Sequence, residues 1–280
     1  MEQFLAAELG DSLGEVETLG TPGPRRLTWA AESAQLGRVV VKARYGDRAD
    51  EKTRWCAANL PRLGARGYPV PEILWHGPLA SQWCLVVESR LPGAPLEAID
   101  PLLLDALVEL VELQADAGLP WDERDFATYQ SYVLFDGWDH VWRDAEASAP
   151  ELCARIRAWL RPVRSRRLPP VDFAHNDLNL SNVLERDGSI TGVVDWDEFG
   201  LNSRATDLVA LAFDCELLGE RAGADRLLAR IDEVVAEDGL RLLVSYRVIS
   251  HVAARARRRD EGGAQESARA AASMLDHLDG

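Results

Sequence analysis

The sequence predicts an α+β protein with two lobes, a small sheet-rich lobe at residues 1–91 and a larger, mainly helical lobe at residues 92–280. Short apolar runs bounded by turn residues fill most of the first 90 positions. In most of the remainder, apolar residues recur at three- and four-residue intervals, which is the period of a helix packed on one side. Between the two patterns stands Leu91-Pro92-Gly93-Ala94-Pro95, where proline and glycine indicate a hinge.

The elements of the first lobe follow from its apolar runs and its breakers. The run Val39-Val40-Val41 is typical of a buried strand, and so is Trp83-Cys84-Leu85-Val86-Val87. Pro69-Val70-Pro71 restricts the backbone and ends the helical pattern before it. We therefore expect strands at residues 14–19, 25–32, 37–44 and 83–87, and one helix at residues 47–63.

The second lobe is helical except for one hairpin. Asp187-Gly188 is a strong two-residue turn signal, and apolar runs flank it on both sides within residues 182–195. With this turn, Asn182 pairs with Val193, and Asn182 and Asp195 become diagonal neighbours at the open end of the hairpin. The helical period predicts helices at residues 102–117, 150–160, 207–218, 224–236 and 240–258.

Composition excludes several classes of function. The 31 basic and 46 acidic residues leave a net charge of -15, which opposes binding to nucleic acid and to anionic membranes. No apolar run is long enough to cross a bilayer, and the amino terminus lacks the basic region of a signal peptide. The four cysteines are far apart and form no pattern of metal ligands or disulfides. These observations favour a cytoplasmic protein.

The densest group of polar residues precedes and follows the hairpin. Asn182 and Asp195 offer oxygen ligands of the kind that Mg²⁺ prefers. Asp177 lies five residues before Asn182, so its carboxylate can lie near the metal and still accept a proton from a hydroxyl. Taken singly, His175 is also compatible with a hydrogen-bonded core histidine. The ordered combination favours phosphoryl transfer, since a metal and an aligned base are its two requirements.

This order resembles the catalytic and metal-binding loops of the protein-kinase superfamily, and more narrowly the aminoglycoside phosphotransferase family of small-molecule and antibiotic kinases. The matching segments are 175–184, 194–198 and 206–208. The resemblance implies a protein-kinase-like fold, Asp177 as catalytic base, Asn182 and Asp195 as magnesium ligands, and His175 and Asp207 as support for the loop. Many relatives carry glycine at the position of Asn176, and His-Pro-Gly-like residues at 179–181.

The resemblance also implies a nucleotide site in the first lobe. Lys42 ends the strand Gly-Arg-Val-Val-Val-Lys, where kinases place the lysine that contacts nucleotide phosphates. A desolvated lysine needs a carboxylate partner, and we prefer Glu51 to Asp47 and Asp50. Residues 20–24 would cover the phosphates of ATP or GTP. Backbone groups of the hinge would bind the adenine, at Glu88, Ser89, Arg90 and Leu91.

The resemblance implies that the acceptor is a cationic antibiotic, and the net charge of -15, which attracts polycations, agrees with this expectation. Gly-Val-Val-Asp-Trp-Asp-Glu at residues 192–198 is similar to the branch of the family that inactivates tuberactinomycin antibiotics such as viomycin and capreomycin. A metabolite kinase for choline, homoserine or an amino sugar is the alternative enzyme, and an inactive nucleotide-binding regulator is the alternative of another class. Trp121, Trp138 and Trp142 are expected to be packing residues. The predicted contacts to ammonium groups are Asp136, Asp139, Asp197, Glu198 and Asp214.

Overall fold

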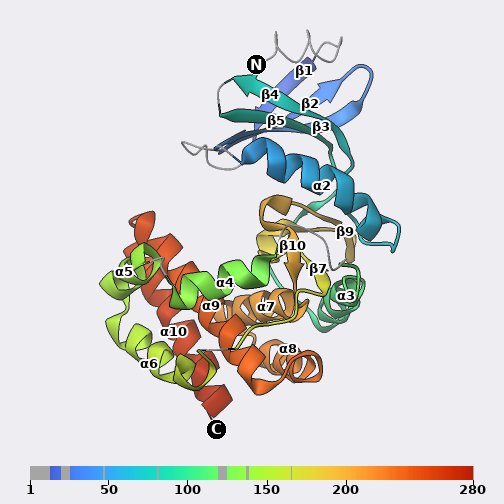
Figure 1. Ribbon diagram of the computed structural model, residues 1–280. Helices are drawn as coiled ribbons and strands as arrows, with labels where there is room; N and C mark the ends of the chain where they lie inside the picture. The colour runs from blue at the N-terminus through green and yellow to red at the C-terminus, as the bar shows by residue number, and fades with distance from the viewer. Residues whose placement is uncertain are drawn as a thin grey trace. The chain divides into compact units, whose positions relative to one another are not determined.

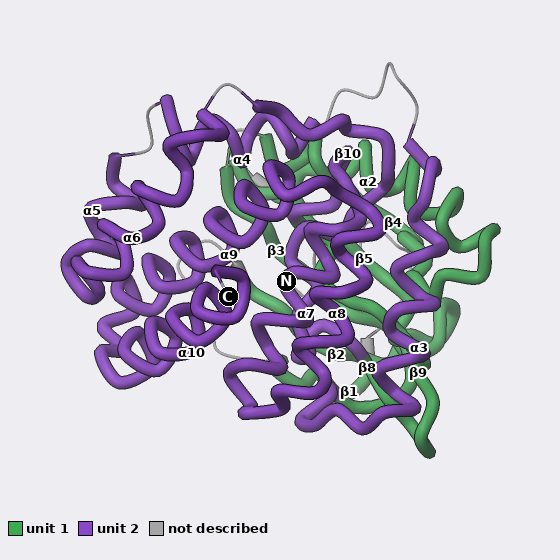
Figure 2. The backbone as a smooth tube through the Cα atoms, turned by 90° about the horizontal axis from the view of Figure 1, so that it is seen from below, with its two compact units in different colours: residues 1–94, 184–197 green, residues 95–183, 198–280 purple. Residues whose placement is uncertain are grey.

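A computed structural model describes residues 13–19, 26–46, 48–80, 82–118, 125–136, 139–164 and 166–279. It divides into two compact units (Figure 2). Unit 1 contains residues 1–94 and 184–197, and unit 2 contains residues 95–183 and 198–280. Turn 20–24, Asp47, Trp121 and Trp138 lie outside the described residues.

Unit 1 is built on a five-stranded sheet with strand order β1-β2-β3-β5-β4. Each neighbouring pair of strands is antiparallel. In the pairing of β3 with β5, Lys42 lies opposite Val86, and Val40 lies opposite Glu88. Since side chains alternate between the faces of a strand, Lys42 and Glu88 belong to one face. The strands are β1 (Leu13–Thr18), β2 (Arg26–Ser33), β3 (Gly37–Tyr45), β4 (Ile73–Ala80) and β5 (Trp83–Ser89).

The two faces of this sheet differ in chemistry. One face carries a buried apolar cluster of Ala31, Val39, Val41, Ala43, Leu85 and Val87. The helix α2 (Ala49–Gly64) lies along the sheet (Figure 1), and Thr53 Oγ1 of α2 lies 3.8 Å from Cys84 Sγ. Thr53, Cys56, Leu60 and Leu63 form the buried stripe of this helix, at the spacing that its amphipathic pattern predicts. The helix therefore covers the face to which Cys84, Lys42 and Glu88 belong.

The hairpin at residues 183–193 confirms the predicted turn. Strands β8 (Val183–Arg186) and β9 (Ser189–Val193) flank Asp187 and Gly188, whose φ angles of 56° and 77° are those of a type I′ turn. The sequence placed this hairpin in the second lobe, whereas it packs mostly with unit 1. Val193 N donates to Pro69 O at 2.8 Å, and Thr191 Oγ1 donates to Pro92 O at 2.6 Å. These hydrogen bonds tie the hairpin to Pro69, in the loop after α2, and to Pro92, in the hinge.

Gly93 shows why the hinge needs a glycine. Its φ is +106°, and a Cβ there would lie 2.6 Å from Glu185 O and from Thr191 Oγ1. Any side chain would push the hairpin away. The short strand β6 (Ala94–Pro95) follows and joins β8 and β9 in a three-stranded sheet.

Unit 2 is a helical body arranged around α7. Every residue from Ala205 to Cys215 in α7 is buried, because most of its side chains are apolar and its two carboxylates, Asp207 and Asp214, accept hydrogen bonds from the protein. A two-stranded pair, β7 (Asp172–Ala174) with β10 (Gly200–Asn202), flanks the segment that contains Asp177. The helices are α3 (Pro101–Glu112), α4 (Phe126–Phe135), α5 (Asp139–Ser148), α6 (Pro150–Leu160), α7 (Ala205–Leu218), α8 (Arg221–Val234), α9 (Glu237–Arg257) and α10 (Glu261–Asp279).

All the helices predicted from the helical period are present, although α3 ends at Glu112 and not at residue 117. The sequence missed β4, β6, β7, β10, α4, α5 and α10. In α5 the buried side chains are Val141, Trp142 and Ala145, a stripe too narrow to stand out in an acidic segment. In α10 the buried face is rich in alanine, which gives little hydrophobic contrast. Among the described residues, no helix has both the length and the apolar character needed to cross a membrane.

Candidate active site

The loop that follows β7 is fastened to the buried carboxylate of Asp207. Asp207 Oδ2 accepts from His175 N and Oδ1 accepts from Asn176 N, at 2.8 and 2.9 Å. Gln114 Nε2 also donates to Asp207 Oδ2, at 2.8 Å. Burial raises the pKa of Asp207, while the nearby His175 and these hydrogen bonds lower it. The carboxylate thus fixes the start of the loop, as expected of a supporting residue.

His175 is fully buried, and its ring supports the backbone. Its Nδ1 accepts from Asp177 N at 3.3 Å. A buried imidazole with this contact orients the residue two positions later. The structure therefore places His175 as a support for the loop. Because the side chain is buried, it is not positioned to contact a substrate that enters from solvent.

Asn176 occupies the position at which many relatives have glycine, and its backbone explains the choice. Its φ is 67°, in the left-handed region that glycine and asparagine tolerate best. Its Nδ2 lies 2.9 Å from Glu198 O and 3.1 Å from Ala174 O, and its Oδ1 accepts from Asn202 Nδ2 at 2.7 Å. The asparagine therefore keeps the backbone conformation and adds a bond between the loop and β10.

Asp177 stands at the exposed side of this loop, with its side chain 46% exposed. Oδ1 lies 3.3 Å from Asn179 Nδ2 and 3.1 Å from Arg247 Nη1. The backbone carbonyl of Asp177 accepts from Asn182 Nδ2 at 2.9 Å. This bond occupies the amide nitrogen of Asn182 and leaves its carbonyl oxygen to face a ligand. A carbonyl oxygen is a suitable donor for a hard divalent cation, so Asn182 fits the predicted role.

Asp214 is placed differently from the prediction. The side chain of this residue is buried, with Oδ2 accepting from Leu180 N at 2.8 Å and Oδ1 lying 3.3 Å from Arg247 Nη2. Burial raises the pKa of Asp214, and the charge of Arg247 lowers it. Because both oxygens are occupied by the protein, Asp214 is a second support for the loop and is not available to an ammonium group of a substrate.

In unit 1, the partner of Lys42 is Glu88 and not Glu51. Lys42 Nζ lies 2.6 Å from Glu88 Oε2, and both side chains are more than nine-tenths buried. Glu51 is about half exposed and pairs with Arg48 at 2.7 Å. Glu88 reaches Lys42 because the two are diagonal neighbours on paired strands. The pair lacks the angles of a hydrogen bond, so the Lys42 donors are unsatisfied among the described residues.

The hinge offers fewer free backbone groups than predicted. Ser89 N donates to Glu72 O and Arg90 N donates to Arg38 O, each at 2.9 Å. These two N–H groups are therefore not available to an adenine ring. Leu91 N, the next backbone donor along the hinge, makes no hydrogen bond to the described part of the chain.

The segment Asp195-Trp196-Asp197 is held in unit 1 by its tryptophan. Trp196 Nε1 donates to Val193 O at 2.8 Å, and its ring packs edge-on against Tyr68. Arg44 on β3 lies 2.7 Å from Asp197 Oδ1 and 3.6 Å from Asp195 Oδ1. Asp197 therefore serves an ion pair inside unit 1, which argues against its predicted contact with a substrate. Asp195 has a φ of 66° and carries a hard oxygen donor at the end of the hairpin.

The remaining predicted acceptor contacts lie in unit 2 in three different settings. Asp136 is exposed after α4, 3.8 Å from Arg167, and Asp139 is exposed in the first turn of α5. Glu198 lies near Tyr129 and Tyr246: burial, with a smaller contribution from the charge of Glu198, raises the pKa of Tyr129 to about 12. Of the three remaining predicted substrate contacts, Glu198 is therefore the one beside aromatic side chains.

The sequence did not reveal the aromatic group beside Glu198. The ring centroids of Phe126 and Tyr129 lie 5.0 Å apart, and Tyr246 lies 6.0 Å from Phe126 and 6.3 Å from Tyr129. The signal that could have found it is the spacing of three between Phe126 and Tyr129, which places both on one face of a helix. Aromatic faces next to a carboxylate suit a cationic ligand.

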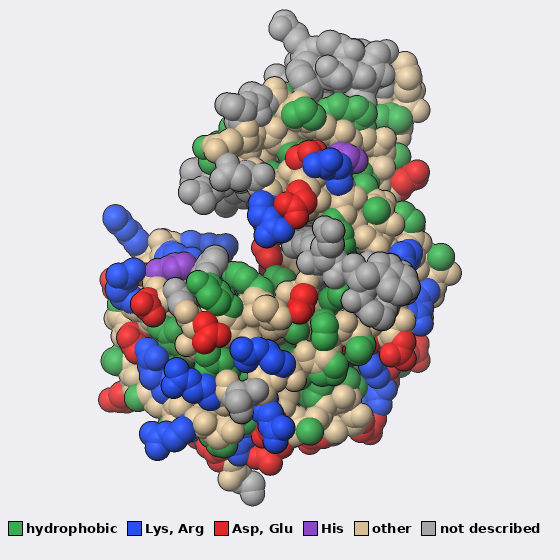
Figure 3. Space-filling view, viewed as in Figure 1, with side chains coloured by type: hydrophobic (Ala, Val, Ile, Leu, Met, Phe, Trp, Pro, Cys, Tyr) green, Lys and Arg blue, Asp and Glu red, His purple; other side chains and the backbone are tan. Residues whose placement is uncertain are grey.

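Surface charge does not by itself locate the acceptor. On the face of unit 2 in Figure 3, basic and acidic side chains are interspersed. Several of the arginines form ion pairs, for example Arg155 with Asp276 at 2.6 Å and Arg166 with Asp238 at 2.9 Å. Among the described residues, no group of three or more His, Cys, Asp or Glu side chains forms a metal site. The acidic surplus is thus largely spread over the surface.

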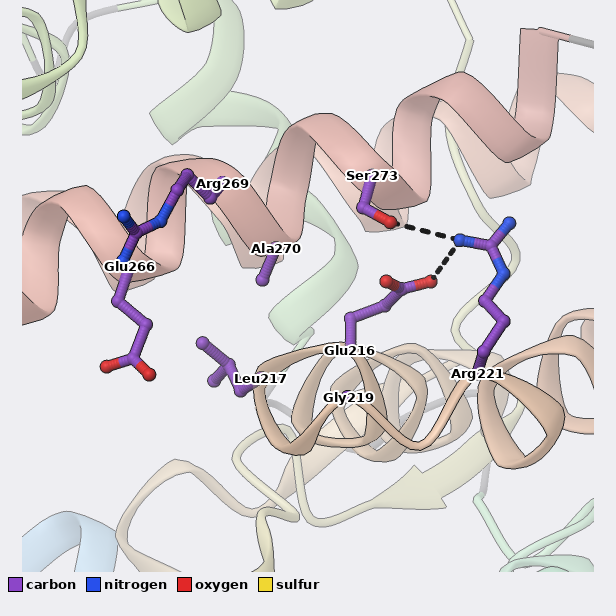
Figure 4. A pocket seen from close by; sticks show the side chains of 8 residues that line it. All are labelled: Glu216, Leu217, Gly219, Arg221, Glu266, Arg269, Ala270 and Ser273. Atoms are coloured by element: carbon purple, nitrogen blue, oxygen red, sulfur yellow. Dashed lines mark hydrogen bonds and ion pairs between the residues drawn. The ribbon is translucent and has the colours of Figure 1, made fainter.

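A cavity of about 380 Å³ on α7 and α10 is separate from the catalytic loop. Figure 4 shows the side chains of Glu216 and Ser273 pointing toward Arg221. Arg221 Nη1 lies 3.0 Å from Glu216 Oε1 and from Ser273 Oγ. These three groups satisfy one another, and the charged side chains of Glu266 and Arg269 also line the cavity.

The chain is similar to known phosphotransferases in sequence. The sequence pattern of the phosphotransferase enzyme family matches residues 23–243. Viomycin phosphotransferase of Streptomyces vinaceus is 34% identical over 161 residues, which are 48% of this chain and 52% of the relative. The chain thus spans about half the length of the curated relative it matches.

Solved structures share the fold at low sequence identity. A thermostable mutant of aminoglycoside phosphotransferase APH(4)-Ia, in ternary complex with AMP-PNP and hygromycin B, is 17% identical, with a TM-score of 0.74 and coverage of 98% of this chain and 97% of that one. Spectinomycin phosphotransferase in complex with ADP and spectinomycin is 12% identical, with a TM-score of 0.70 and coverage of 98% and 97%. These likenesses confirm the predicted kinase-like fold.

Proposed function

Because the chain belongs to the phosphotransferase enzyme family, we propose that it transfers the terminal phosphate of ATP, or of GTP, to a hydroxyl group of a cationic antibiotic. The observation that carries this proposal is the loop at residues 175–182. Its carboxylate at Asp177 is half exposed, while the residues around it are buried or bound to the protein. Such a carboxylate is suited to accept a proton from a substrate.

The proposed reaction divides the work among the residues. Asp177 accepts the proton of the acceptor hydroxyl as the hydroxyl oxygen attacks the terminal phosphorus. The bond from this phosphorus to the bridging oxygen breaks, and the nucleoside diphosphate leaves with the electron pair. Asn182 and Asp195 would hold Mg²⁺, which neutralises phosphate charge when bound. Lys42, whose ammonium donors are unsatisfied, would bind a nucleotide phosphate.

The acceptor class rests on the relative and on the aromatic group. The curated relative is named for viomycin, so we propose a tuberactinomycin peptide such as viomycin or capreomycin as the first candidate. A cationic group of this substrate would lie against Glu198 and Tyr129, where a carboxylate and an aromatic face are close together. Asp136 and Asp139 are candidates for weaker contacts, because they are exposed.

A panel of acceptors tests the proposal. Purified protein is incubated with labelled ATP or GTP and Mg²⁺, and transfer is measured to viomycin, capreomycin, aminoglycosides, choline, homoserine and an amino sugar. We expect transfer to a cationic antibiotic, with Asp177→Asn lowering turnover by about 100- to 10,000-fold. Asp232→Asn, which removes an exposed carboxylate of α8 from the same unit, is the matched control and should retain turnover. Transfer to metabolites alone would overturn the antibiotic assignment. Nucleotide binding without transfer to any acceptor would favour a regulator.

A further inference from the structure

Arg247 joins the two carboxylates that lie on either side of the catalytic loop. It projects from α9, and its guanidinium lies 3.1 Å from Asp177 Oδ1 through Nη1 and 3.3 Å from Asp214 Oδ1 through Nη2. The side chain of Arg247 is 14% exposed, so these contacts are largely shielded from water. The three residues come from three separate segments of unit 2, and the loop, α7 and α9 meet at this one guanidinium.

We propose that Arg247 is a positioning residue that holds Asp177 by one carboxylate oxygen and leaves the other free for the acceptor hydroxyl. This inference rests on the proposed function, because it assumes that Asp177 is the base. Both donors to the Asp177 carboxylate, Arg247 Nη1 and Asn179 Nδ2, reach Oδ1. Oδ2 makes no hydrogen bond and no ion pair within the described part of the chain. The carboxylate is thus oriented by one oxygen, and Oδ2 is the atom that takes the proton.

Asp214 is the anchor of this arrangement. It binds the loop directly through Leu180 N at 2.8 Å and binds Arg247 through its other oxygen. A carboxylate so buried is costly unless a cation lies beside it, and Arg247 is that cation. The guanidinium is therefore held from the side of α7, which fixes the position from which it reaches Asp177.

The residue type matters as much as the charge. A guanidinium is a planar fork, so its two Nη atoms can bind two carboxylates at once in a fixed geometry. The ring of Phe213 lies beside the guanidinium, with its centroid 5.8 Å from Cζ, and restricts it further. An ammonium group on a flexible chain has no such geometry. Lysine at this position would keep the charge but would not hold both carboxylates.

The decisive experiment is a double-mutant cycle on the full chain. Turnover and the Michaelis constant for the acceptor found in the panel are measured for wild type, Arg247→Met, Asp177→Asn and the double variant. We expect Arg247→Met to lower kcat by about 10- to 100-fold and to change KM by less than about threefold. In the Asp177→Asn background, the same change should cost less than about twofold, because there is no base left to position. Independent, multiplicative effects would overturn the proposal.

Two further variants keep the test informative if Arg247→Met folds poorly. Arg247→Lys retains the charge, and we expect it to recover less than half of the lost turnover. Asp214→Asn keeps an acceptor for Leu180 N but weakens the hold on Arg247, so kcat should fall while KM stays near the wild-type value. Arg241→Met is the matched control, since Arg241 is on the same helix and pairs with Glu237. It should retain full turnover.

The outcomes separate this inference from the proposed function. If wild type transfers phosphate and Asp177→Asn does not, the proposed function stands. Full turnover in Arg247→Met or in Arg247→Lys would then refute the positioning role alone. If Asp177→Asn retains full turnover, Asp177 is not the base, and both proposals fail together.

Discussion

Lys42 in unit 1 and Arg247 in unit 2 are both largely buried beside carboxylates, and these two cations are bound differently. In unit 1, Lys42 faces a single carboxylate, Glu88, at 2.6 Å and has unsatisfied donors. In unit 2, Arg247 lies between Asp177 and Asp214, and each of its two Nη atoms reaches one of these carboxylates, while its Nε has no hydrogen-bond partner among the described residues. A buried cation with spare donors is prepared for an anionic ligand, whereas a cation shared by two protein carboxylates fixes the protein itself. The comparison therefore separates a ligand-binding charge from a positioning charge.

The largest expected effect on stability is at the buried pair of unit 1. Glu88→Gln leaves the Lys42 ammonium buried without a charged partner, so we expect a loss of about 3–5 kcal/mol in the free energy of unfolding. Urea unfolding at pH 7.5 measures it. Glu51→Gln is the control, because Glu51 is half exposed and its loss should cost less than about 0.5 kcal/mol. A larger loss for Glu51→Gln than for Glu88→Gln would contradict the assigned pair.

The next effect concerns the ligand role of Lys42. Lys42→Met removes the cation assigned to a nucleotide phosphate, and we expect kcat/KM for the nucleotide to fall by about 100- to 1,000-fold. Lys52 is the other lysine of the chain and lies on α2, so Lys52→Met is a natural control that should stay within about twofold. Steady-state kinetics with varied nucleotide and saturating acceptor decide the matter. Equal losses in the two variants would remove the special role of Lys42.

The sequence predicted the motif residues better than it predicted their partners. Periodicity placed Asp207 and Asp214 two turns apart on one face of α7, and both accept backbone N–H groups from the loop. The step to a substrate contact at Asp214 failed because Arg247 lies far away in the sequence. In the same way, Glu51 was preferred for Lys42, since the pairing of β3 with β5 that brings Glu88 near depends on strand register.

The same limit explains the elements that were predicted and those that were missed. Asp187-Gly188 specifies its turn by local conformation, and the structure has the hairpin at these residues. The stripes of α5 and α10 are less apolar, so packing with other helices decides their structure. Tyr129 of α4 and Tyr246 of α9 belong to one aromatic group, and this contact also depends on the packing of two helices. Long-range packing was the information that the sequence patterns lacked.

The charge of Arg247 also acts on His251, one turn along α9. Burial, together with the charges of Arg247, Arg255 and Arg258, lowers the pKa of His251 to about 3. Below pH 6.5 the unfolded chain takes up a proton at this residue, but the folded chain does not until about pH 3. Stability contributed by the neutral imidazole is present above pH 6.5 and declines as the pH falls, by about 2 kcal/mol at pH 5.

His251→Gln should therefore reduce the acid sensitivity of the fold. We expect the loss of unfolding free energy between pH 7.5 and pH 5 to be smaller in the variant than in wild type by about 2 kcal/mol, as measured by urea unfolding at both pH values. In Arg247→Met, this loss should lie between the values of wild type and His251→Gln, because the variant removes one of the charges near His251. An unchanged loss in His251→Gln would show that His251 takes up its proton in the folded state.

The smallest expected effect separates backbone strain from side-chain hydrogen bonds at Asn176, the residue before Asp177, the proposed base. Asn176→Gly and Asn176→Ala both remove the hydrogen bonds to Glu198 O and from Asn202 Nδ2. They differ in backbone freedom, because φ at this position is 67° and alanine resists the left-handed region whereas glycine does not. We expect the alanine variant to be less stable than the glycine variant by about 1 kcal/mol in urea unfolding. Since strain at the loop would also displace Asp177, turnover should fall further in the alanine variant. Equal stability would mean that the loop changes its backbone conformation once the side chain is gone.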